Sequence, residues 1–144
     1  MKIISQDRRS WVDLSVVEVR PNDAPDGGDV CVGAVAQAAG FSGENPAVWI
    51  DGEELRRFAA ELLALAQTRC GSAKLRGMNY QADRHELELE ISAADEAGHL
   101  TAHVLLRRHN TVQWLEARLE FEADPTAVSQ FASELQALGE RMGA

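Results

Sequence analysis

Apolar and polar residues alternate along much of the chain, which is the pattern of strands that bury one face. The alternation predicts strands over residues 11–20, 30–38, 48–50 and 73–78. Segments rich in proline, glycine, asparagine and aspartate separate them, and residues 21–28 and 41–46 are therefore predicted to be turns or loops.

The clearest alternation lies between residues 86 and 122, where three strands follow one another. Because their connections are short, they should form an antiparallel meander. A four-residue loop at 94–97 and a two-residue turn at 109–110 bring their apolar faces together. This register places His103 between Glu88 and Glu116, and it places Ile91 opposite Leu100.

Two segments instead place apolar residues at helical spacing. The first begins at Asp51, a capping residue, and ends near Gly71. The second begins at Asp124-Pro125 and ends near Gly143. The sequence thus predicts a single α+β domain over residues 1–144. In it, a mostly antiparallel sheet of six or seven strands, including the C-terminal three-strand meander, packs with two amphipathic helices.

Composition narrows the class of partner. The chain has 23 Asp and Glu against 14 Lys and Arg, so its formal charge is −9. An acidic surface repels phosphate backbones and anionic lipids, which argues against nucleic acid and membranes and favours a basic protein partner. Solubility alone is a sufficient reason for such a charge as well.

The same sequence predicts a cytoplasmic protein. Cys31 and Cys70 have no close spacing, so they are interpreted as reduced thiols. The first residues contain no continuous apolar segment of the kind found in signal peptides.

No familiar catalytic or cofactor motif occurs in the sequence. His99 and His103 are four residues apart, but on a strand that spacing is roughly 13 Å, too far for one metal ion. There is no nucleophile elbow, no recognisable cysteine-nucleophile context and no phosphate-binding loop. We therefore expect no metal, no cofactor and no enzymatic activity, and we interpret the chain as a binding protein.

The outward face of the meander supplies the candidate binding residues. Carboxylates on a rigid sheet suit a basic partner, and an exposed tryptophan among charges is a candidate anchor. The predicted partner-binding residues are Glu86, Glu88, Glu90, His103, Trp114, Glu116, Glu120 and Glu122. The alternative is a solvated face of cross-strand charge pairs, with Trp114 covering a sheet edge.

A series of short motifs also follows in order along nearly the whole chain. They are Phe41-Ser42-Gly43-Glu44, Val48-Trp49-Ile50-Asp51, Glu54-Leu55 with Phe58 and Leu62, Gly71-Ser72-Ala73-Lys74-Leu75, Glu86-Leu87-Glu88-Leu89, Gly98-His99-Leu100, and Leu119-Glu120-Phe121 with Asp124 before the last helix. Their order and spacing resemble those of the WapI-type immunity proteins of bacteria. Pro125 and residues 78–81 depart from that pattern.

The resemblance implies a cytoplasmic protein that binds and neutralises a toxin domain, often a nuclease, and has no catalytic residues to carry over. With the acidic charge, it leads us to expect stoichiometric occlusion of a basic toxin domain. Two alternatives stay open at this stage. One is a small-ligand-binding domain or an enzyme with a pocket between helix and sheet, and the other is a subunit of a homo-oligomer.

Overall fold

The computed structural model describes residues 1–21, 28–79, 84–109 and 114–143, and within them it confirms the α+β class. The elements are β1 (Lys2–Ile4), β2 (Trp11–Val19), β3 (Asp29–Ala38), β4 (Phe41–Asp51), α1 (Gly52–Thr68), β5 (Ser72–Asn79), β6 (Arg84–Ala93), β7 (Leu100–His109), β8 (Trp114–Ala123) and α2 (Pro125–Gly143). The described residues thus form eight strands, where six or seven were predicted.

The strand that was not predicted is β1, and β4 is longer than the strand predicted at residues 48–50. Residues 41–46 were predicted to be a turn, but they form the first half of β4. Pro46 is tolerated because the pairing of β3 with β4 is irregular between Val32 and Ala34, which leaves Pro46 out of the register. Such a bulge is one of the few places where a strand can contain proline.

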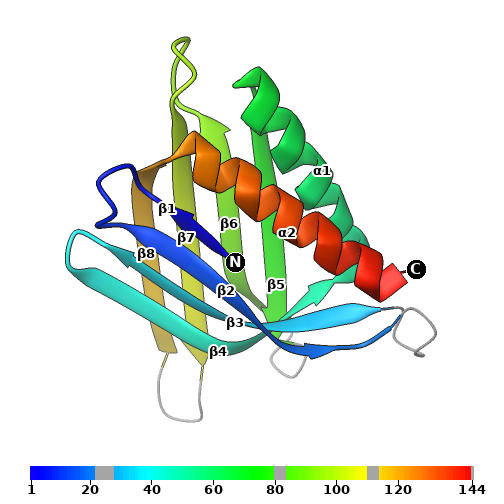
Figure 1. Cartoon of the computed structure of the whole chain (residues 1–144). Helices are drawn as coiled ribbons and strands as arrows, with labels where there is room; N and C mark the ends of the chain where they lie inside the picture. Colours follow the sequence, from blue (N-terminus) through cyan, green and yellow to red (C-terminus); the bar gives the residue numbers. More distant parts are fainter. Residues whose placement is uncertain (22–27, 80–83, 110–113, 144) are drawn as a thin grey trace.

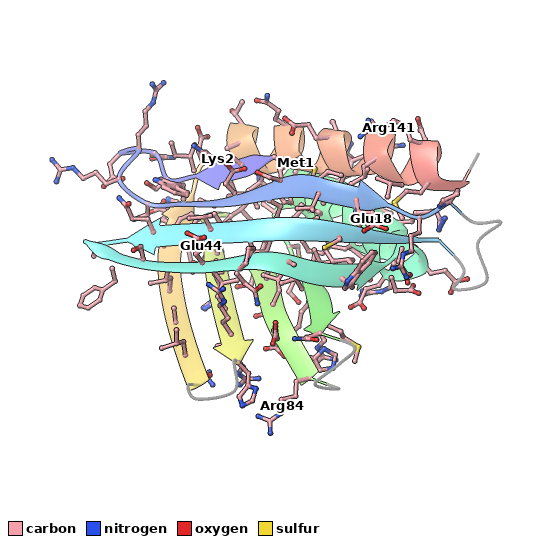
Figure 2. All side chains as sticks on the ribbon, turned by 90° about the horizontal axis from the view of Figure 1, so that it is seen from below. Met1, Lys2, Glu18, Glu44, Arg84 and Arg141 are labelled. Carbon is pink, nitrogen blue, oxygen red and sulfur yellow. The ribbon has the colours of Figure 1, made fainter. Side chains whose placement is uncertain are left out.

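Each strand pairs antiparallel with the next one along the chain, in the order β1 to β8. Between β4 and β5 the described residues form only the pair of Trp49 with Met78, and the sheet folds over there into two layers, β1–β4 and β5–β8. In Figures 1 and 2 the strands of one layer run across those of the other. The first and last strands also meet, through a bridge between Ser5 and Ala123.

Both helices lie on the same side of the sheet, in the angle between its two layers (Figure 1). They pack on each other, α1 also contacts β5, and α2 also contacts β1. Their predicted apolar stripes are buried, and Phe58 and Phe131 are fully enclosed. Full burial of a side chain of this size contributes about 1.5–3 kcal/mol, so the two stripes account for much of the core.

The predicted register of the meander is wrong, although its faces are right. Ile91 pairs with Ala102 rather than Leu100, and His103 lies between Glu90 and Glu120 rather than between Glu88 and Glu116. The shifts are two residues in one hairpin and four in the other. Because both are even numbers, these shifts by themselves move no side chain to the other side of the sheet.

The two hairpin connections explain these shifts. The Ala94 N–H donates to the His99 carbonyl over 2.7 Å, so Ala94 faces His99 and the four-residue loop is 95–98, one residue later than predicted. In the second hairpin, His109 pairs with Trp114 rather than turning at 109–110. Residues 110–113 lie outside the described part of the chain.

Candidate functional site

The face of the β5–β8 layer turned away from the helices, here called the outer face, carries most of the predicted binding residues. The registers align its side chains in rows across four strands. One row is Lys74, Glu90, His103 and Glu120, and the next is Arg76, Glu88, Leu105 and Arg118. The predicted residues from three different strands are therefore neighbours.

The outer face is hollowed at its centre. A depression of about 390 Å³ is lined by Lys74, Glu88, Glu90, His103, Val104, Leu105, Arg118, Leu119 and Glu120. Leu105 forms part of its floor, because it is only 7% exposed although it points outward. The depression therefore combines an apolar floor with a charged rim, and four of the eight predicted residues line it.

Ion pairs satisfy much of the charge on this face. Glu88 lies 3.8 Å from Lys74 and 3.7 Å from Arg76, and Glu116 lies 3.1 Å from Arg107 and 3.2 Å from Arg118. Such exposed pairs contribute little to stability individually.

The outer face is consequently less acidic than the sequence analysis expected. It carries five glutamates against four lysine and arginine residues, so its formal charge is −1. On this face, the carboxylates with no lysine or arginine within ion-pair distance among the described residues are those of Glu90, Glu120 and Glu122. Glu120 lies 3.4 Å from the His103 ring nitrogen Nδ1.

Glu86 does not belong to the outer face, and the expectation that it would be exposed there is wrong. It is 2% exposed. Its carboxylate accepts hydrogen bonds from Asn45 Nδ2 at 2.7 Å and from Asn79 Nδ2 at 3.1 Å. The reason is a bulge, because Gly77 pairs with Leu87 and Met78 with His85, which leaves Glu86 as an extra residue.

Trp114 is placed only as a backbone position. It begins β8, opposite His109, and its side chain lies outside the described part of the structure.

The sequence analysis also missed an exposed aromatic residue. Phe41 is 75% exposed at the start of β4, beside a hollow of about 510 Å³ that borders β8. The only signal in the sequence was a large apolar residue within a segment otherwise typical of a turn.

The helical side of the molecule has a different hollow, of about 560 Å³, between α1 and α2. Small and apolar residues such as Ala59, Ala60 and Leu63 line it, together with Arg56 and Glu140. It lies between the two helices, not between helix and sheet as the small-ligand alternative predicted.

The described residues contain no group of three or more His, Cys, Asp or Glu side chains placed to hold a metal ion. None of their helices is long and apolar enough to cross a membrane.

Comparison with known proteins gives one match. A family model described as the immunity protein WapI-like family matches residues 2–143, which is nearly the whole chain. Neither a curated protein nor a solved structure matches the chain.

Proposed function

Because the chain belongs to the WapI-like immunity protein family, we propose that it neutralises a toxin domain in the cytoplasm by binding it one to one and covering its active surface. Family membership is the observation that carries this proposal, because an immunity protein implies a toxin as its protein partner. In this proposal the protein acts only by binding the toxin and carries out no catalytic step.

The outer face is the proposed docking surface. Its backbone belongs to a hydrogen-bonded sheet, and its central depression offers a place for a partner side chain to enter. The predicted residues that take part are Glu88, Glu90, His103, Glu116, Glu120 and Glu122.

The partner is expected to be basic, as nucleases commonly are because they bind phosphates. A lysine or arginine that enters the depression would meet Glu90 and Glu120, whose charge the protein itself leaves uncompensated by lysine or arginine. Charge-assisted hydrogen bonds to such carboxylates are among the stronger polar contacts. Occupation of the face would then keep substrate away from the toxin.

The test begins with the purified protein and the product of the adjacent open reading frame. Light scattering should show a one-to-one complex, and calorimetry should show weaker binding as salt rises. The informative variant is Glu90→Lys with Glu120→Lys. The matched control is Glu140→Lys with Glu53→Lys, which changes the charge equally at exposed residues on the helices.

The expected effect follows from Coulomb's law. Two unit charges about 8 Å apart in water interact by about 0.5 kcal/mol. Each reversal turns one such attraction into a repulsion of equal size, so the two reversals cost about 2 kcal/mol of binding free energy at low salt, or about thirtyfold in affinity. At physiological salt, screening over one Debye length leaves about a third of that energy. An equal loss in the control variant would refute the docking surface, and no complex at either salt would refute the proposed function.

A further inference from the structure

Strand β8 has a long unpaired edge. Its residues pair with β7 along one side, whereas on the other side, among the described residues, only Ala123 forms a bridge, to Ser5 just after β1. Within the described part of the chain, residues 115–122 therefore have backbone amides and carbonyls on one edge with no neighbouring strand. An edge of this kind can accept a strand from another chain.

A strand added beside this edge of β8 would lie beneath the end of the β3–β4 hairpin. Strand β4 crosses over β8 at Gly43, where a Cβ atom would come within 2.7 Å of the Ala117 Cβ. Phe41 precedes Gly43 by two residues on the same face of β4, since they pair with Ala38 and Ala36. Phe41 therefore lies past the crossing, and its 75% exposure shows that β8 does not cover it.

The hollow of about 510 Å³ occupies this covered place. On one side it is lined by Ala38, Ala39, Phe41 and Ser42 of the hairpin, and on the other by every residue from 116 to 120. Successive residues of a strand point to opposite faces, so a hollow that touches all of them follows the edge of β8 rather than one face.

The side chains along this edge indicate which strand would fit. On the inner side, Phe41 and Leu115 are 75% and 53% exposed, which is unusual for large apolar residues and typical of binding anchors. On the outer side, β8 presents three glutamates (116, 120 and 122) against one arginine, Arg118, a formal charge of −2. An added strand would therefore place apolar residues beneath Phe41 and basic residues beside the glutamates.

We propose that the edge of β8 captures an extended segment of the toxin, in which apolar residues alternate with lysine or arginine, as a ninth strand of the sheet. This proposal rests on the proposed function and adds a second contact to it. A second copy of the chain fits less well. Antiparallel self-pairing centred on the hollow, at Arg118, would place that arginine opposite itself and Glu116 opposite Glu120.

The first test needs no toxin. An end-blocked peptide of alternating lysine and valine is titrated against the protein and compared with a peptide of the same composition in two blocks. The alternating peptide should bind at least about tenfold more tightly. N-methylation of every second residue, which blocks one of its edges, should abolish that advantage. Equal binding of the two peptides, or binding unaffected by N-methylation, would overturn the proposal.

Variants then assign the contact to the edge. Phe41→Ser should reduce binding of the alternating peptide by about tenfold, because it removes the exposed anchor. The control is Val17→Ser, which removes an apolar side chain 62% exposed on β2. Both residues are exposed, so neither change should affect folding, and circular dichroism checks this. An equal loss in both variants would overturn the assignment.

The toxin separates the two proposals. If the wild-type protein binds the toxin and Phe41→Ser binds it equally well, strand capture is wrong while the proposed function holds. If the toxin does not bind at all, the proposed function fails, and the peptide titration still decides whether the edge takes a strand. A dimer in light scattering that dissociates in Phe41→Ser would assign the edge to a second copy and overturn capture of a toxin segment.

Discussion

Asn45 connects the two layers of the sheet through a buried carboxylate, and replacing it with alanine should destabilise the protein severely. Asn45 and Glu86 are 3% and 2% exposed. The Asn45 Nδ2 group donates to Glu86 Oε2 and to the Arg107 carbonyl, each at 2.7 Å. Its Oδ1 atom accepts from the Ala47 N–H at 3.1 Å. One side chain in β4 thus binds β6 and β7 of the other layer.

The magnitude follows from these three hydrogen bonds. A bond to a charged acceptor contributes about 1.5–3 kcal/mol and each of the two neutral bonds about 0.5–1.5 kcal/mol, so Asn45→Ala should cost about 2.5–6 kcal/mol. That is a large part of a typical stability of about 5–15 kcal/mol. Glu86→Gln should cost less, about 1–3 kcal/mol, because the amide keeps the shape but can accept from only one of the two asparagine side chains.

Urea denaturation followed by tryptophan fluorescence measures both effects, with Ser42→Ala, an exposed change on the same strand, as the control. A double-mutant cycle should then show that Asn45→Ala costs about 1–2 kcal/mol less once Glu86 is glutamine. A cost below about 1 kcal/mol for Asn45→Ala would refute the reasoning, since it would mean that water replaces the asparagine and that the layers do not depend on it.

Three further predictions concern single contacts. Gly43→Ala should cost about 1–3 kcal/mol in the same urea assay, because its Cβ would lie 2.7 Å from that of Ala117, and adding Ala117→Gly should restore most of the loss. The Asp95 carboxylate, 2.7 Å from His99 Nδ1, raises the pKa of His99 above 6.5, and His99 in turn lowers the pKa of Asp95 below 3.8. Their mutual stabilisation should be complete between pH 3.8 and 6.5 and be lost on either side, and an NMR titration should show the His99 pKa fall in Asp95→Asn. Burial raises the pKa of Cys31, so a thiol reagent should modify only the other, exposed cysteine until denaturant is added.

The sequence predicted the parts of this fold that depend on periodicity. Alternation identified the inner and outer sides of the meander, and helical spacing identified both buried stripes, because a buried face must be apolar wherever it lies. Periodicity cannot determine register, since a slip of two or four residues preserves every face. The place where each connection begins and ends decides it. Ala94 bonds to His99 in the first hairpin and His109 pairs with Trp114 in the second, and no composition pattern specifies either contact.

The candidate site was predicted only in part for a related reason. Glu86 follows the same alternation as Glu88 and Glu90, yet a single extra residue in β6 turns it inward to meet Asn45. That contact is between residues 41 positions apart. A bulge and a long-range polar partner are properties of the folded pair of strands, so one strand's sequence does not reveal them.

The two proposed contacts share β8 and should therefore act as one continuous interface with separable kinetics. Arg118, Leu119 and Glu120 line both the depression of the outer face and the hollow along the edge. A strand added at that edge would extend the outer face by one row of basic side chains, next to Glu116 and Glu120.

The charges of the outer face attract a basic partner before contact, whereas Phe41 contributes to binding only after the partner has covered its side chain. Glu90→Lys with Glu120→Lys should therefore lower mainly the association rate, in a salt-dependent manner. Phe41→Ser should raise mainly the dissociation rate, by about tenfold and independently of salt. Surface plasmon resonance with the toxin measures both rates. If Phe41→Ser changed only the association rate, the aromatic ring would be acting in the encounter rather than as an anchor, and strand capture would lose its main support.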